Sequence, residues 1–108
     1  MTIKSLITKY QKAFNYHDLN KLSELFDNKI RLKDWDIDVK GKKNVLKANK
    51  EIFEKVKKIK CIPIQTIIYR KTAICEVYVV VNKKKINVVD IIKFNDKKKI
   101  IYIKAFKI

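Results

Sequence analysis

The sequence predicts an α+β fold, in which helices from the first half of the chain pack on one face of a curved antiparallel sheet. Apolar residues within residues 2–56 recur at the three-to-four spacing of amphipathic helices. Residues 59–107 are instead rich in Ile, Val and Tyr, in segments separated by short polar turns. Helices followed by strands, rather than alternating with them, are typical of an α+β domain.

The chain has 108 residues, which indicates a single domain spanning residues 1–108. Its longest apolar run is Val77–Val81, far short of the ~20 residues that a membrane-spanning helix needs. The N-terminal sequence MTIKSLITKY has no apolar stretch of the kind found in signal peptides. We therefore expect a cytoplasmic protein that does not associate with a membrane.

Two helices are predicted at the start of the chain. The first covers residues 2–16, and its apolar side consists of Ile3, Leu6, Ile7, Tyr10, Ala13 and Phe14. Asp18 is a favourable N-cap for a second helix, from Leu19 to about Phe26. His17 directly precedes this cap, and we expect it to be structural rather than catalytic.

A short strand and a third helix follow. Ile30, Leu32 and Asp34 alternate with polar residues, which predicts a strand over residues 30–35 whose inward row ends in a carboxylate. Gly41, the only glycine, interrupts the chain. A third helix is predicted from about Lys42 to Val56, with Asn49 on its apolar side.

Four strands are predicted in the second half, over Ile59–Tyr69, Ala73–Asn82, Lys85–Asn95 and Lys98–Lys107. Several of their residues are apolar at successive positions, whereas an antiparallel sheet with one wet face alternates. Three helices cover only one face, so we predict a homodimer through the outer face of the sheet. The alternative is that codon usage has enriched Ile and Val.

The chain carries 27 Lys and Arg against 11 Asp and Glu, a net charge of +16. Such a charge is typical of proteins that bind nucleic acid or anionic surfaces. However, every basic residue except Arg31 and Arg70 is lysine. Lys, Ile and Asn have AT-rich codons, and nucleic-acid sites favour Arg. We therefore expect a compositional charge, and no nucleic-acid partner unless the lysine runs (55–60, 83–85 and 97–99) form one patch.

Metal and cofactor sites are not predicted. Cys61, Cys75 and His17 are too few for a structural zinc site, which needs four ligands. A single glycine excludes a glycine-rich phosphate loop. We expect both cysteines to be reduced and buried, and the protein to work without a cofactor.

Three segments follow one another in a recognisable order: Tyr10 to Phe26, Asp34-Trp35 followed by Gly41, and Val89 to Phe106. Their order and spacing resemble the nuclear transport factor 2-like superfamily, in its SnoaL-like and ketosteroid-isomerase-like branch. The resemblance covers the whole chain. It implies a cone-shaped, cystatin-like fold: a strongly bent antiparallel sheet wrapped around three N-terminal helices, with a pocket at the open end and frequent dimerisation through the sheet.

The resemblance also implies a catalytic site. Asp34 occupies the position of the proton-shuttling base of ketosteroid isomerase, and Tyr10 and Asp90 those of its two oxyanion donors. Ketosteroid isomerase is a known example of a carboxylic acid kept neutral by an apolar site. The residues themselves agree with these roles. Asp90 is flanked by β-branched residues, which raises a carboxyl pKa, whereas Asp34 lies beside polar residues and is expected to be ionised.

The sequence departs from ketosteroid isomerase at the pocket. Trp35 stands in place of Pro, Asn49 in place of Tyr, and Lys107 in place of an apolar residue near the mouth. These changes predict a smaller carbonyl substrate than a steroid. The residues expected to contact the ligand are Phe14, Trp35, Asn49, Ile92, Ile103 and Ala105.

Three functions remain open at this point. The first is a cofactor-independent isomerase, cyclase or dehydratase acting on a small enolisable carbonyl compound. The second is a non-catalytic module that binds an unknown small apolar or anionic molecule. The third is a binder of anionic polymers. Structural roles for the three site residues also remain open: Tyr10 as a core aromatic, Asp34 as a turn cap, and Asp90 in an ion pair. A cavity that contacts Tyr10, Asp34 and Asp90 together would favour the first function.

Overall fold

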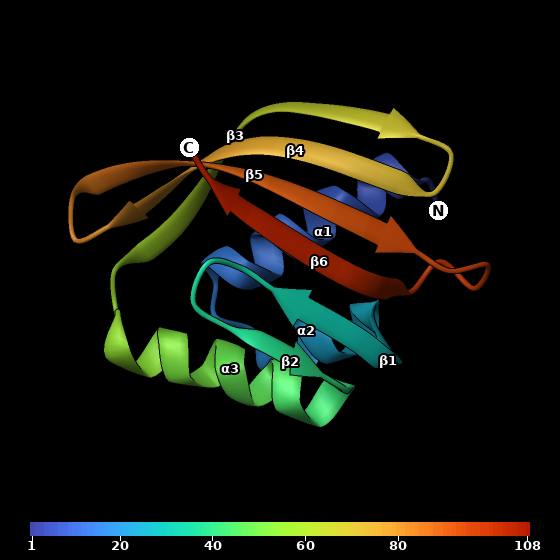
Figure 1. Ribbon diagram of the computed structural model, residues 1–108, viewed down its shortest axis with the longest axis horizontal. Coiled ribbons are helices and arrows are strands. Elements are labelled where there is room, and N and C mark those ends of the chain that lie inside the picture. The colour runs from blue at the N-terminus through green and yellow to red at the C-terminus, as the bar shows by residue number, and fades with distance from the viewer.

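Three helices and a six-stranded sheet form the fold of the computed structural model, which describes residues 1–108 (Figure 1). The helices are α1 (Ile3–Asn15), α2 (Leu19–Leu25) and α3 (Lys42–Lys55). The strands are β1 (Phe26–Lys33), β2 (Asp38–Lys40), β3 (Ile59–Tyr69), β4 (Thr72–Val81), β5 (Lys84–Phe94) and β6 (Ile100–Lys107). None of the helices is long and apolar enough to cross a membrane.

The sheet is curled and unclosed, and its strands lie in the order β2-β1-β6-β5-β4-β3. The predicted α+β cone is therefore confirmed. It differs from the expected antiparallel sheet at one pair, because β1 runs parallel to β6, with Arg31 beside Tyr102. The apolar alternation of a strand indicates which face it buries, but neither its partner nor its direction, so this pair could not be predicted from the sequence.

The helices cover the concave face of the sheet. Figure 1 shows α1 behind β4, β5 and β6, while α3 runs along the lower edge beside β1 and β2. α1 packs on β3 and β4, α3 on β1 and β2, and α2 contacts both other helices. The centre of the core lies between these layers, where Leu22, Ile30, Val45, Ile92 and Ile100 are fully buried.

The region between α2 and α3 is organised differently from the prediction. The predicted strand over residues 30–35 is β1, which begins earlier and ends at Lys33. Residues 34–37 form a turn, closed by a 2.9 Å hydrogen bond from the Asp34 N–H to the Ile37 carbonyl. The short strand β2 then returns along β1. Asp34 therefore lies in a turn, one residue beyond the end of β1, and not on the inward row of the predicted strand.

Gly41 joins β2 to α3 at a conformation that favours glycine. Its φ is +88°, in the left-handed region, where a side chain would be strained. Its N–H donates to the Ile30 carbonyl at 2.7 Å, so the start of α3 is held against β1. The only glycine of the chain thus fixes α3 beside the sheet.

An amide side chain holds α1 in place over the sheet. Asn15, the last residue of α1, accepts from the Cys61 N–H at 2.7 Å and donates to the Cys61 carbonyl at 3.0 Å. At the other end, the Thr2 hydroxyl caps the helix by accepting from the Ser5 N–H. α1 is thereby fixed at both ends, and Tyr10 lies between them.

The outer face of the sheet remains exposed and largely apolar. Ile67, Ile74 and Ile91 lie side by side on β3, β4 and β5. The most exposed side chains on this face include Ile62, Ile67, Tyr69, Ile74, Tyr78 and Phe106. This face agrees with the sequence observation that the strands are apolar on both sides.

Candidate functional site

A cavity of about 180 Å³ opens inside the cone, between the helices and the concave face of the sheet. Its walls are mostly apolar. It brings Tyr10 of α1, Asp34 of the β1–β2 turn and Asp90 of β5 to one space. Segments 80 residues apart in the chain thus present a phenol and two carboxyls to a common cavity.

Five of the six residues expected to contact a ligand line this cavity: Phe14, Trp35, Asn49, Ile103 and Ala105. Ile92 is not among the lining residues. It is fully buried on the concave face of β5, two residues beyond Asp90, where it belongs to the core. The sequence analysis missed Gln11, Leu32, Ile52, Ile59, Cys61, Val79, Val81, Ile86 and Val88. Several of them occupy inward-facing positions of the strands, which the apolar alternation in the sequence could have indicated.

Asp90 lies on the concave face of β5, between Cys75 of β4 and Ala105 of β6. The carboxyl lies far below the protein surface, although the residue keeps some solvent access through the cavity. Burial, and secondarily the charge of Asp34, raises the pKa of Asp90 to about 7. A substantial fraction of Asp90 is therefore protonated near neutral pH, and a protonated carboxyl donates a hydrogen bond.

Tyr10 points from the middle of α1 into the same space. Burial, and then the charge of Asp90, raises the pKa of the Tyr10 phenol well above its ordinary value, so it stays protonated. No buried polar side-chain atom of the protein lacks a hydrogen-bond partner. Neither the Tyr10 hydroxyl nor the Asp90 carboxyl has a hydrogen-bond partner in the protein. Since every fully buried polar side-chain atom has one, these two groups are exposed to the cavity, where they can contact a ligand.

Asp34 has one oxygen engaged and one free. Its Oδ1 accepts from the Asp36 N–H at 2.7 Å and from the Ile37 N–H at 2.8 Å. Asp34 therefore caps the turn, as the structural alternative held, and it also lines the cavity. The two backbone bonds orient the carboxylate and leave Oδ2 available to accept a proton.

Trp35 and Lys107 lie together near the rim of the cavity. The Trp35 side chain lines the cavity but remains 45% exposed, so it does not fill the space. The Lys107 Nζ lies 5.2 Å from the centre of the Trp35 ring, within the range of a cation–π contact. Asn49 of α3 also lines the cavity; it is buried, and its amide donates to the Val45 carbonyl.

Both cysteines are unreactive, and the histidine packs against an aromatic ring. Cys61 and Cys75 are buried and unbonded, as expected. Burial raises the pKa of Cys61 to about 12 and that of Cys75 to about 11, so neither forms a reactive thiolate. The His17 ring stacks on Phe53, with centroids 4.2 Å apart. The structure contains no cluster of acidic, Cys and His side chains that could hold a metal ion.

The three lysine runs gather at opposite ends of the molecule. Lys98 and Lys99 contact Met1 and Glu24, next to α1 and α2. The other two runs meet at the far end of β5, where the Asn82 N–H bonds the Lys58 carbonyl. β5 has 11 residues, which span roughly 35 Å at ~3.3 Å each. The runs therefore do not form the single patch that an anionic-polymer binder would need.

Solved structures with the same architecture were found, although no protein-family model and no curated protein matches the sequence. A candidate SnoaL-like polyketide cyclase from Shewanella denitrificans OS-217 superposes with a TM-score of 0.88 at 15% identity, covering 98% of this chain and 90% of that one. An NTF2-like protein of unknown function from Cytophaga hutchinsonii ATCC 33406 gives 0.86 at 12% identity, over 100% and 91%.

A candidate ketosteroid isomerase from Kribbella flavida DSM 17836 gives a TM-score of 0.85 at 14% identity, covering 98% of this chain and 77% of that one. At these identities the likeness concerns the fold. The protein therefore has the nuclear transport factor 2-like fold, which it shares with SnoaL-like and ketosteroid-isomerase-like proteins.

Proposed function

We propose that the protein catalyses enolisation of a small carbonyl compound in the cavity of the cone, without a cofactor. The observation that carries this proposal is that one cavity is lined by Tyr10, Asp34 and Asp90. Two hydrogen-bond donors and one proton acceptor are the groups that enolisation needs. Fold neighbours described as candidate polyketide cyclases and isomerases support the same reaction class.

The reaction begins when Asp34 Oδ2 takes a proton from the carbon next to the substrate carbonyl. The electron pair of the broken C–H bond forms a C=C bond, and the carbonyl electrons move onto oxygen. The Tyr10 hydroxyl and the protonated Asp90 carboxyl donate hydrogen bonds to this enolate oxygen. In an isomerisation, the substrate has a second C=C bond beside the α-carbon, so the enolate is conjugated with it. Asp34 then returns the proton to the far carbon of that bond, the C=C bond moves next to the carbonyl carbon, and the carbonyl forms again.

The volume of the cavity limits the size of the substrate. Small-molecule pockets usually measure about 300–1,000 Å³, whereas this cavity measures about 180 Å³. Its apolar walls and the Trp35 ring leave room for a compound much smaller than a steroid. Lys107 at the rim favours a substrate with a carboxylate or another anionic group.

The test follows exchange of α-protons in a panel of small ketones and 2-oxo acids in D₂O by NMR. We expect Asp34→Asn to slow the exchange by about 10²–10⁴-fold, the usual contribution of a general base. Tyr10→Phe should cost about 10²–10³-fold, and Asp90→Asn less, because an amide still donates. The wild-type rate should fall as the pH rises through about 7, where Asp90 loses its proton.

Asp36→Asn is the matched control, because Asp36 lies in the same turn with an exposed side chain that does not line the cavity. It should exchange protons at the wild-type rate. If the wild type binds panel compounds in the cavity but exchanges no proton faster than buffer, the enzyme proposal fails, and the protein is instead a ligand-binding module.

We also propose that two copies pair through the outer face of the sheet. Four strands of about ten residues cover a projected area of about 600 Å². That area is comparable to the roughly 800 Å² that each partner buries in a standard interface. Exposed isoleucines lie on this face, with Ile67 56% and Ile62 44% exposed, and exposed apolar patches mark interaction sites.

A further inference from the structure

A second hollow lies outside the cone, between α1 and α2, and it is larger than the cavity described above. It measures about 430 Å³ and is bounded by α1, α2 and Lys99, which directly precedes β6. We call it the α1–α2 groove. Its floor is aliphatic, formed by Leu6, Ala13 and Leu25. The volume lies within the range of sites that bind small molecules, about 300–1,000 Å³.

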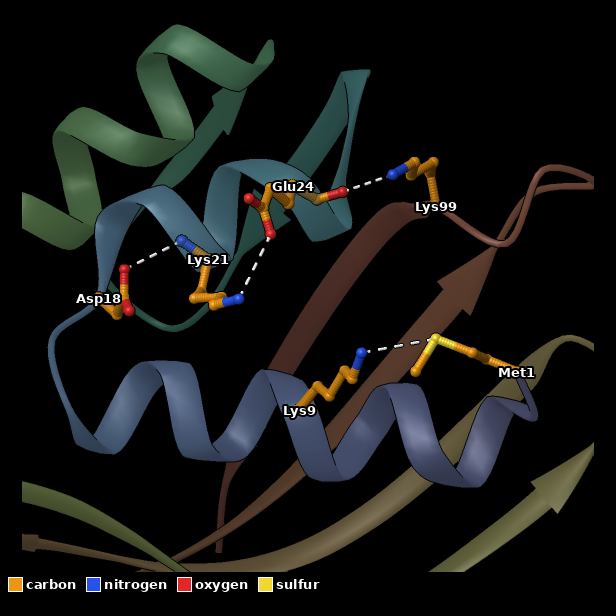
Figure 2. Close-up of polar contacts among 6 residues, drawn as sticks. All are labelled: Met1, Lys9, Asp18, Lys21, Glu24 and Lys99. Atoms are coloured by element: carbon orange, nitrogen blue, oxygen red, sulfur yellow. Dashed lines mark hydrogen bonds and ion pairs between the residues drawn. The ribbon is translucent and has the colours of Figure 1, made fainter.

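Lysines surround this floor. Lys9 and Lys12 of α1, Lys21 of α2 and Lys99 all line the groove, against only Asp18 and Glu24. Figure 2 shows Lys9 extending from α1 toward the gap below α2, and Lys99 reaching the end of α2 from the other side.

The two acidic side chains of the groove are engaged locally. Asp18 Oδ1 caps α2 by accepting from the Lys21 N–H at 3.0 Å. The Glu24 carboxylate lies 3.9 Å from the Lys21 ammonium (Figure 2).

The remaining lysines have no anionic partner. The ion pairs of the structure involve neither Lys9, Lys12 nor Lys99. Lys9 donates to the Met1 sulfur at 3.5 Å, and Lys99 donates to the Glu24 carbonyl. Lys9 and Lys12 are three residues apart on one helix face, where like charges repel by a few tenths of a kcal/mol. A bound anion would relieve this repulsion, and the aliphatic floor would contact an apolar body.

We propose that the α1–α2 groove binds a free monomeric amphiphile, a small molecule with an apolar body and one anionic group. The anionic group contacts Lys9 and Lys12, and the body covers the floor. Tyr16, which is 80% exposed, also lines the groove and offers its ring to the apolar part. The two acidic side chains in the groove disfavour a phosphodiester backbone, which would present several negative charges in a row.

The test uses decanoate below its micelle concentration, followed by ¹⁵N NMR in 150 mM salt. We expect saturable binding, with shifts at the amides of Leu6, Ala13 and Leu25. The double variant Lys9→Glu, Lys12→Glu should weaken the affinity at least tenfold. Decan-1-ol, which lacks the charge, should bind at least tenfold more weakly than decanoate to the wild type.

The matched control is Lys47→Glu, Lys50→Glu, which changes two exposed lysines at the same spacing on α3. It should keep the wild-type affinity, and circular dichroism establishes that both variants fold. Equal losses in both double variants would overturn the proposal, as would shifts confined to Val88 and Ala105 in the cone. Binding to anionic vesicles or to oligo(dT) in the groove, without binding of monomeric decanoate, would also overturn it.

Discussion

The two faces of the central sheet give a carboxyl group opposite surroundings. Asp90 and Glu76 lie on the neighbouring strands β5 and β4, one register position apart and on opposite faces. On the outer face, Glu76 accepts from the Gln65 amide at 3.0 Å and from the Asn87 amide at 3.2 Å. On the concave face, Asp90 faces the cavity and accepts no hydrogen bond from the protein, and burial raises its pKa to about 7.

This difference shows what each face is suited for. Hydrogen-bond donors from both neighbouring strands stabilise the Glu76 carboxylate, so the outer face stays fixed in shape and suits packing against another surface. The Asp90 carboxyl has no hydrogen-bond partner in the protein, which lowers the free energy of unfolding. A ligand in the cavity can form the missing hydrogen bond, which is the expected property of a functional site.

The largest expected effect concerns the outer face. The double variant Ile74→Lys, Ile91→Lys places two charges in the centre of the proposed interface and should convert the dimer to monomer at micromolar concentration. Sedimentation velocity measures this. The control Thr8→Lys, Asn20→Lys adds the same charge to exposed helix positions and should remain dimeric. A wild type that is already monomeric at that concentration contradicts the proposed pairing.

The next effect concerns Asp90 and depends on pH. The folded protein keeps the Asp90 proton up to about pH 7, whereas the unfolded chain releases it near pH 4. The free energy of unfolding therefore falls as the pH rises through this window, by at most about 4 kcal/mol. Water in the cavity reduces this cost, so we expect Asp90→Asn to stabilise the protein by about 2 kcal/mol at pH 8.

Urea denaturation at pH 8 and at pH 4 measures this difference. At pH 4 the wild-type carboxyl is already neutral, and Asp90→Asn should change the stability little. A variant that is less stable than the wild type at pH 8 would mean that the Asp90 carboxylate has a stabilising partner.

Glu76→Gln makes the same carboxyl-to-amide change on the outer face and should have the opposite effect on the free energy of unfolding. It weakens two hydrogen bonds to a charged acceptor, so we expect a loss of about 1 kcal/mol at pH 8. Urea denaturation again provides the measurement. A gain in stability comparable to that of Asp90→Asn would show that the two faces do not differ as described.

Much of this fold could be predicted from the sequence, because its signals are local. The apolar spacing of residues 2–16 gives α1 to within one residue at each end, and Ile59–Tyr69 matches β3. Asp18 caps α2 as predicted. The turn at residues 34–37 and the strand β2 were missed because an Asx turn and a three-residue strand have no periodic pattern.

The site was predictable only in part, for the same reason. Tyr10, Asp34 and Asp90 were chosen through resemblance, and each has a local feature that agrees with its position. The curvature of the sheet decides which inward side chains face the cavity and which face the core. Ile92 and Ile103 are both inward and pair across β5 and β6, yet only Ile103 lines the cavity. Periodicity carries no information on that distinction.

Titration of the Asp90 carboxyl by carbon-13 NMR tests the central claim most directly. We expect the wild-type resonance to titrate at about 7. In Asp34→Asn the Asp90 pKa should be lower than in the wild type, because the neighbouring charge is gone while burial remains. The amide retains an oxygen that can cap the turn, so stability should change by less than about 0.5 kcal/mol. A wild-type Asp90 that ionises near 4, the ordinary value for Asp, would contradict the claim that the cavity holds a protonated carboxyl beside Tyr10.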